Sequence, residues 1–409
     1  MIPGSSSPRK ADTSFILVTV LLDTLGLGLV IPVGPRLISS FFHDDLGVGA
    51  HHMGLLISLY SVMQFVFAPV LGGLSDRFGR RPVILLSLAG AAASYLASAL
   101  APSFGWLLAG RTVAGITGAS FTAAGAYMAD VTAPEKRAQA FGLIGAAFGL
   151  GFILGPVLGG LLGDAGVRVP YFVAAGLNAL NMVYGLFVLP ESLPKAHRRR
   201  FSWSRTNPFD TLVVLARHEL VLGLTGTMVC TFLGQWIIQS TWPFIGQARF
   251  GWTPRQIGIS IMLVGAGAAV AQGALVRPIV AQLGERRTLL LGLAVAALGT
   301  IGFGFVDRGS VMFVLLVPYA LSGVAGPAGQ ALISREVGVS EQGEVQGALN
   351  SLNGLTAIGG PLIGTALFAR FSAEGPIPHI PGAPFFAMAA CNLLALLIAL
   401  RLFARRDPA

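Results

Sequence analysis

Long apolar runs, separated by short polar stretches, dominate the pattern along the chain. A helix rises 1.5 Å per residue, so a run of about 20 apolar residues can cross the roughly 30 Å hydrocarbon core of a bilayer. Backbone groups in lipid must be hydrogen-bonded within their own segment, so these runs predict helices. Twelve are expected, near residues 14–39, 52–74, 80–101, 105–130, 136–163, 169–189, 216–247, 254–282, 286–306, 309–335, 341–371 and 382–404.

The composition supports lipid as the main surrounding of the chain. Hydrophobic residues make up 54% of the 409 residues and charged residues only 11%, whereas soluble domains carry about 25% charged residues. So few charges exclude a soluble enzyme, a nucleic-acid binder and a disordered scaffold. The polar residues 1–13 lead into an apolar stretch longer than a signal sequence, which we interpret as a retained first span. We therefore expect an all-α membrane protein.

The basic residues indicate the orientation of the spans. An even number of spans puts both termini on one side, where 19 of the 27 Lys and Arg residues fall; six lie on the other side. Arg111 and Arg277 remain within spans. The positive-inside rule then predicts that both termini are cytoplasmic. The net charge of +9 follows from this topology and does not imply a nucleic-acid partner.

One substantial hydrophilic stretch, residues 190–215, divides the chain. It predicts an N-terminal six-helix bundle over 1–189, a cytoplasmic linker over 190–215 and a C-terminal six-helix bundle over 216–409. We interpret the linker as a solvated segment that can also touch anionic lipid, rather than as a regulatory site.

The two halves resemble copies of each other at a fixed offset of 205 residues. Two parallel six-helix repeats around a central cavity are typical of one class of secondary transporters, with the substrate site near the midplane. The matches are Gly79, Arg81 and Leu85 with Gly284, Arg286 and Leu290, and Gly142 and Gly155-Pro156 with Gly347 and Gly360-Pro361.

Longer motifs resemble the major facilitator superfamily, and closely the tetracycline/proton antiporter family of drug exporters. The resemblance covers nearly the whole chain and implies the major facilitator fold of two six-helix bundles. The matching text includes LLDTLGLGLVIPVGP, LYSVMQFVFAPVLGGLSDRFGRRPVILLSL, GRTVAGITGA, FGLIGAAFGLGFILGPVLGG, ARFGW, LGERRTLLLG and EQGEVQGALNSL.

Asp23 and Arg111 are the candidate proton-coupling residues. Asp23 lies about ten residues into the first span, where a carboxylate costs at least about 2.5 kcal/mol. Desolvation favours its protonated form and a nearby cation its ionised form, so it is a group that can bind and release a proton. Arg111 is the only basic residue well inside a span of the first half, and the resemblance also implies a coupling role for it. A permanently paired, purely structural Asp23 or Arg111 is the alternative.

The loop GGLSDRFGRRPV is expected to form a conformational gate. Asp76 can accept backbone N–H bonds at a helix start, where the helix dipole also favours an anion, and we expect it to serve the eleventh span. Arg80 is expected to pair with Asp130. The second half has Ala281 and Glu285 at the positions that correspond to Asp76 and Arg80, so we expect this charge cluster in the first half only. The gate set is Gly73, Asp76, Arg77, Gly79, Arg80, Arg81 and Asp130.

Glycines in the fifth span resemble the antiporter signature of the superfamily and favour export over import. Tight packing around a proline kink explains the same pattern without a transport role. The residues are Gly145, Gly149, Gly155, Pro156, Gly159 and Gly160.

Polar and aromatic residues inside spans are the candidate substrate-binding set, because aromatic faces and a few amides suit an amphipathic organic molecule. Any one of them can instead be a packing residue. The set is Tyr60, Gln64, Phe148, Phe152, Asn178, Gln235, Trp236, Gln239, Trp242, Gln272, Asn350 and Asn353, with Asn178, Gln64 and Gln272 favoured by the resemblance.

Three positions depart from the tetracycline exporters. Ser94, Ala268 and Ala296 replace an Asp, a His and an Asp of the family, which argues against tetracycline itself as substrate and leaves coupling to Asp23 and Arg111. Cys230 and Cys391 lack metal-ligand spacing, and no phosphate-binding loop occurs, so neither a metal nor another cofactor is expected. Protons are the expected coupling ion.

The sequence thus predicts a proton-coupled exporter of small amphipathic compounds in the bacterial inner membrane, not an enzyme. The expected partners are the lipid bilayer and a small-molecule substrate, with a monomer sufficient and no protein partner implied. Two alternatives stay open: a proton symporter that imports a small metabolite, and a transport-inactive membrane receptor.

Overall fold

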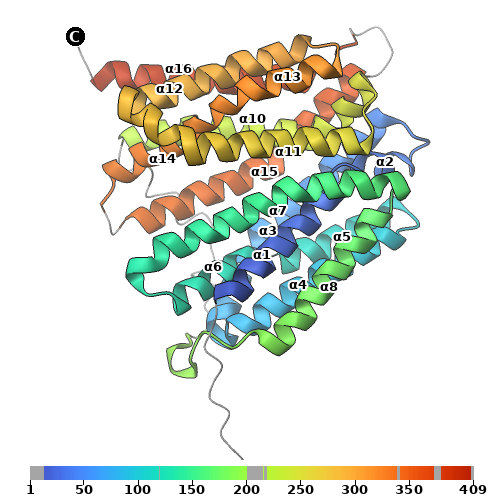
Figure 1. Ribbon diagram of the computed structural model, residues 1–409, viewed down its shortest axis with the longest axis vertical. Coiled ribbons are helices and arrows are strands. Elements are labelled where there is room, and N and C mark those ends of the chain that lie inside the picture. The colour runs from blue at the N-terminus through green and yellow to red at the C-terminus, as the bar shows by residue number, and fades with distance from the viewer. Residues whose placement is uncertain are drawn as a thin grey trace, which may run out of the picture.

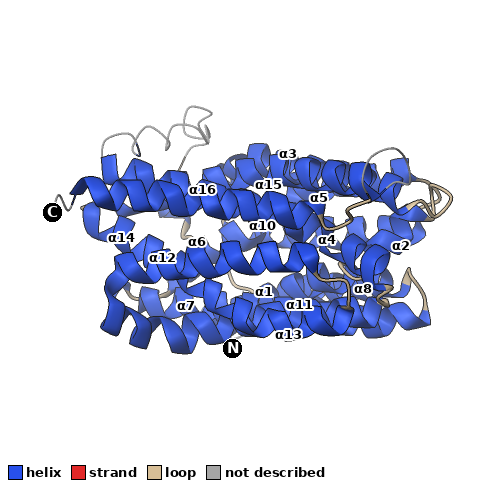
Figure 2. Cartoon of the chain, turned by 90° about the horizontal axis from the view of Figure 1, so that it is seen from above, coloured by secondary structure: helices blue, strands red, loops and turns tan. Residues whose placement is uncertain are grey.

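The computed structural model describes residues 13–118, 120–199, 215, 219–338, 341–372 and 379–406. Helices make up almost all of this described chain (Figure 2). The α-helices are α1 (Thr13–Val30), α2 (Gly34–Ser39), α3 (Leu46–Phe78), α4 (Arg80–Leu100), α5 (Phe104–Thr117), α6 (Ser120–Val131), α7 (Arg137–Ala165), α8 (Val169–Val188), α10 (Glu219–Phe250), α11 (Pro254–Val270), α12 (Val276–Phe305), α13 (Gly309–Tyr319), α14 (Ala325–Glu336), α15 (Gln342–Ser372) and α16 (Ala383–Arg406).

The helices supply the twelve predicted spans. Ten helical segments among the described residues are long and apolar enough to cross a membrane. One of these, Pro254–Phe305, contains two spans, because Gly284 with φ 75° and ψ 167° turns the chain between them. The fourth span is present as α5 and α6, each too short alone. Pro254–Phe305 also contains a π-helical turn, η4 (Ala271–Leu275).

Many large apolar side chains point outward, as expected of a surface that faces lipid. Phe187, Leu298 and Phe305 are each at least 70% exposed. In water, such side chains spread over the surface would drive aggregation. The outer surface of the bundles therefore suits a bilayer.

The helices form two groups, the blue-to-green group α1–α8 and the yellow-to-red group α10–α16 (Figure 1). In the first group α1 packs on α7, α4 on α8 and α3 on α5; in the second, α10 packs on α15 and α16. Phe15, Leu88 and Tyr127 are buried in one core, and Leu224, Leu293 and Phe403 in another. The predicted boundaries at 190 and 216 stay a prediction, since most of 200–218 lies outside the described residues.

The two bundles meet mainly through two helix pairs, α7 with α11 and α3 with α15. Gly160 approaches the backbone of Pro254, and Gly258 approaches the backbone of Pro156. In the second pair the Ser58 hydroxyl donates a hydrogen bond to the Ile358 carbonyl at 2.7 Å. A side chain at these glycines would separate the backbones, so the contacts depend on small residues.

The bundles touch at one end and part at the other. We call the end that holds the turn between α3 and α4 and residues 190–199 the linker side (left in Figure 1) and the opposite end the far side. The α11-facing side of α7 is packed at Ile153, Pro156 and Gly160, but at Gly149, Gly145 and Gly142 on the same side of the helix an added Cβ would meet nothing within 4 Å. The structure is therefore open on the linker side and closed on the far side.

Candidate functional site

Asp23 and Arg111 lie in the interior of the first bundle beside three tyrosines. Both residues are partly buried, on α1 and α5. The Tyr60 and Tyr95 hydroxyls each interact electrostatically with both charges, and Tyr171 interacts with Arg111. The Asp23 charge on α1 thus lies near hydroxyls of α3 and α4, and the Arg111 charge on α5 lies near hydroxyls of α3, α4 and α8.

Gln64 and Tyr60 attach α3 to the break between α5 and α6. The Gln64 amide donates hydrogen bonds to the Gly118 carbonyl at 3.0 Å and to the Tyr60 hydroxyl at 3.3 Å. The break leaves carbonyl groups without helical partners, and an amide is a suitable donor for them. Because Tyr60 also interacts with the charges of Asp23 and Arg111, Gln64 and Tyr60 lie next to these two residues.

On the second bundle, the Trp236 indole donates a hydrogen bond to the Asn353 side chain at 3.1 Å. Gln235 and Asn350, on the same two helices, are exposed, and Gln239 is partly exposed. These predicted residues thus gather on α10 and α15.

Asn178 and Trp242 are buried inside their own bundles. Asn178 is fully buried, donates to the Ala174 carbonyl at 3.0 Å and packs against Gly26. Trp242 is 7% exposed; its indole donates to the Ser260 hydroxyl at 2.8 Å, and its ring packs against Trp252. Their role in binding stays a prediction. Of the three favoured residues, Gln64, Asn178 and Gln272, the last lies exposed in the other bundle.

The glycines of the predicted antiporter motif divide into packed and unpacked positions. Gly155 and Gly159 approach α1, where Gly28 lies against Gly155 and Pro156. Gly160 packs on α11, whereas Gly145 and Gly149 face open space. The Phe148 and Phe152 rings, on the same helix, stack with centroids 6.3 Å apart.

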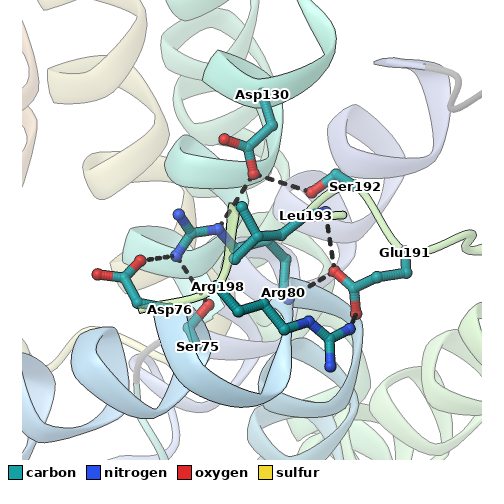
Figure 3. Close-up of polar contacts among 8 residues, drawn as sticks. All are labelled: Ser75, Asp76, Arg80, Asp130, Glu191, Ser192, Leu193 and Arg198. Atoms are coloured by element: carbon teal, nitrogen blue, oxygen red, sulfur yellow. Dashed lines mark hydrogen bonds and ion pairs between the residues drawn. The ribbon is translucent and has the colours of Figure 1, made fainter. Parts of the chain in front are cut away.

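The predicted gate is a connected ion cluster on the linker side (Figure 3). The Arg80 guanidinium binds the Asp76 carboxylate at 2.6 Å and the Asp130 carboxylate at 3.1 Å. The expected pairing of Arg80 with Asp130 is present. The Asp76 carboxylate lies on Arg80 instead of on the eleventh span, here α15, from which α3 has parted at this end.

The remaining predicted gate residues shape the turn between α3 and α4. Gly79 has φ 108°, a conformation that favours glycine. The Arg81 guanidinium donates to the Leu186 carbonyl at 2.6 Å, in the last turn of α8, and Arg77 lies over the Phe78 ring. Gly73 lies in the last turns of α3. Their role as a gate stays a prediction.

The beginning of the linker docks on this cluster, which sequence reasoning missed. The Glu191 carboxylate accepts hydrogen bonds from the backbone N–H groups of Arg80 at 2.8 Å and Leu193 at 3.1 Å, so it caps the start of α4 (Figure 3). The Ser192 hydroxyl donates to Asp130 at 3.0 Å, and Arg198 lies 3.9 Å from Glu191. The interpretation of residues 190–215 as a solvated linker did not include these contacts, which form because a carboxylate that follows α8 lies beside unpaired N–H groups at the start of α4. For the rest of the linker that interpretation stays a prediction.

The second bundle contains a counterpart of the Arg80–Asp130 pair with the charges exchanged. Glu285 and Arg335 pair at 2.9 Å, and both lie 205 positions after Arg80 and Asp130. The expectation of a cluster without counterpart is therefore wrong for this pair, although Ala281 does remove the equivalent of Asp76. Adding the 205-residue offset to Asp130 as well as to Arg80 would have identified the Arg335–Glu285 pair from the sequence.

Comparison with known proteins agrees with this fold. The sequence model of the Major Facilitator Superfamily matches residues 16–277 and 224–409. Tetracycline resistance protein class C of Escherichia coli is 43% identical over 88% of this chain and 91% of its own length, and the class G protein of Vibrio anguillarum is 40% identical over the same shares.

Solved structures show the same architecture. The crystal structure of the human organic anion transporter MFSD10 is 26% identical, with a TM-score of 0.69, and covers 96% of this chain and 100% of that one. An inward-facing, unoccupied bacterial homologue of the human lysosomal transporter Spinster shares the fold at 15% identity and a TM-score of 0.73 over 97% and 98% of the two chains. The chain belongs to the Major Facilitator Superfamily and, within it, to the family of the tetracycline resistance proteins.

Proposed function

We propose that this protein is a proton-coupled exporter of small amphipathic organic compounds that works by alternating access. The single observation that carries the proposal is identity of up to 43%, over most of the chain, with proteins named for tetracycline resistance. The acidic Asp23 inside the first span supports the proton coupling. As a member of a transporter superfamily it is not an enzyme. We place it in the bacterial inner membrane, as its bacterial relatives suggest, and propose that a monomer is sufficient. The distribution of the basic residues supports a cytoplasmic linker side.

In this mechanism the open linker side is the loading state. Deprotonated Asp23, close to Arg111, accompanies substrate entry from the cytoplasm. Rocking of the bundles closes the linker side, and protonation of Asp23 from outside then favours release of the substrate. Each elementary charge moved down a potential of 100 mV supplies about 2.3 kcal/mol.

The linker-side cluster would act as the gate of this cycle. Gly72 and Asp76 lie on the side of α3 that packs on α15 farther along, at Gly54 and Ser58. When the linker side closes, Asp76 would therefore approach the start of α15, whose N–H groups suit an anion. Asp76 would then exchange part of its contact with Arg80 for that helix start.

The test of proton coupling is Asp23→Asn in everted membrane vesicles that carry an imposed proton gradient. Asn cannot bind and release a proton, so gradient-driven accumulation of tetracycline or of another drug found by a susceptibility screen should be lost. Asp164→Asn, the same change at an exposed position at the far end of α7, is the matched control. Accumulation by Asp23→Asn at the parental rate would overturn the mechanism.

The same vesicles separate export from the two alternatives. An antiporter moves substrate against the direction of proton flow, whereas a symporter moves both together. A transport-inactive receptor would bind the drug and show no gradient-dependent flux in either direction.

A further inference from the structure

Arg277 is a charged residue within a predicted span that the proposed mechanism does not use. It is exposed, and it makes no hydrogen bond or ion pair with any residue that the structure describes. A charge inside a span is costly unless it faces a partner or water, and such residues usually mark a transport path. The direction in which Arg277 points therefore decides its role.

The π-helical turn sets that direction. Gly258 and Gly265 identify the side of α11 that packs on α7. In a regular helix the residue about five turns after Gly258 would be Val276. The turn at Ala271–Leu275 accommodates one additional residue, so Arg277 takes this place and faces the first bundle.

Opposite this position the bundles have separated. Along the α7–α11 contact, Gly160 meets Arg255, Pro156 meets Gly258 and Ile153 meets Gly265. Continued in the same register, Gln272 and Arg277 lie across from Gly149, Gly145 and Gly142, where the structure is open. Ala271, by contrast, is buried against Gly323 in its own bundle.

Gln272 completes the arrangement. It lies within the π turn, five residues before Arg277, and is exposed as well. Because the π-helical turn contains one additional residue, the Gln272 and Arg277 side chains are about one helical turn apart and lie on the same side of the helix. A guanidinium donates two parallel hydrogen bonds to a carboxylate, and a neighbouring amide adds another donor.

We propose that Gln272 and Arg277 form an anion-recognition subsite on the wall of the opening between the bundles, and that the exported compound carries a carboxylate or a similar oxyanion. This inference rests on the proposed function for the export step but not for binding. It implies that the chain selects its substrates by charge, beyond shape and hydrophobicity.

The experiment compares two fluorescent probes that differ in one group, 1-pyrenebutyrate with a carboxylate and 1-pyrenebutanol with a hydroxyl. Binding to the full-length protein is measured in phosphatidylcholine nanodiscs without a proton gradient, so the result is independent of whether transport is proton-driven. We expect the parent to prefer the carboxylate probe, and Arg277→Gln to weaken its binding roughly tenfold while leaving 1-pyrenebutanol unchanged. Arg277→Lys should retain part of the preference.

Arg287→Gln is the matched control, because Arg287 is an exposed arginine that follows the turn at Gly284. Lack of preference in the parent, equal losses for both probes in Arg277→Gln, or an equal effect of Arg287→Gln would each overturn the proposal. A second arm adds phosphatidylglycerol. This lipid would displace 1-pyrenebutyrate from the parent, but not from Arg277→Gln, if the subsite binds lipid headgroups. That result would overturn its role in substrate selection.

Discussion

At the scale of single residues, the glycines of α7 serve two different purposes. Gly155 lets α1 and α7 approach within one bundle, since a Cβ there would lie 2.8 Å from the Gly28 Cα atom. Gly145, in the same motif, meets nothing within 4 Å. One sequence motif therefore combines a position that holds a bundle together with a position that leaves room between bundles.

This division predicts opposite effects of the same substitution. Gly155→Ala should destabilise the protein by about 1–3 kcal/mol, because the added methyl group overpacks a backbone contact. Gly145→Ala should leave stability unchanged or raise it by up to about 1 kcal/mol, because alanine is the better helix former. Thermal unfolding of both variants in detergent checks this, and equal losses in the two would contradict the division.

The sequence was sufficient to predict that these glycines matter, but not which of them pack. Gly145 and Gly155 are the same residue type at similar places in one apolar helix, and their difference arises from the conformation of the whole molecule. For the same reason Asn178 and Trp242, chosen as polar or aromatic residues within spans, proved to be buried in their own bundles. Apolar runs report burial in lipid or protein without distinguishing a cavity wall from a core.

At the scale of elements, the loops between α3 and α4 and around Gly284 carry related ion pairs of opposite polarity. In the first bundle Arg80 is shared by Asp76 and Asp130, while in the second Glu285 pairs with Arg335 and Ala281 stands at the position that corresponds to Asp76. Helix positions followed from the length of the apolar runs. The cap from Glu191 did not, because it depends on where a loop returns in space.

The difference predicts that exchange of the two charges is tolerated only in the second bundle. Glu285→Arg alone should destabilise the protein by about 1 kcal/mol, since it places two arginines together and Arg335 is exposed, and Arg335→Glu added to it should restore the pair. In the first bundle, Arg80→Glu combined with Asp130→Arg should not restore stability, because Glu at position 80 faces Asp76. Unfolding midpoints of the single and double variants are the measurement; recovery in both bundles would be evidence against a shared Arg80.

At the scale of the whole molecule, the packed far side and the open linker side define one state of a rocking motion. The same helix, α3, contacts α15 near Gly47 and Ser58 but has open space at Gly72. The repeat at offset 205 predicted two similar bundles. The state adopted depends on small energy differences between interfaces, which a linear pattern does not contain.

Paired cysteines should therefore report the two states with opposite responses. In a background without Cys230 and Cys391, Gly47→Cys with Ala369→Cys should cross-link in the state described, because a Cβ at position 47 lies 3.7 Å from the Ala369 Cα atom. Gly72→Cys with Gly347→Cys, in the same register, should cross-link only when the linker side closes. Each disulfide should stop transport. Conditions that raise the cross-linking yield of one cysteine pair, measured on gels, should lower the yield of the other pair. Full cross-linking of both pairs in one molecule would contradict a rocking motion.

The reversed charges of the Glu285–Arg335 pair, compared with Arg80–Asp130, also restrict how the two bundles diverged from a common ancestor. If the two bundles descend from one duplicated six-helix segment, the exchange required two substitutions, and either one alone would have put like charges opposite each other. The two changes must then have been tolerated together or in quick succession. In the second bundle such an exchange involves two charges, whereas in the first bundle Asp76 adds a third.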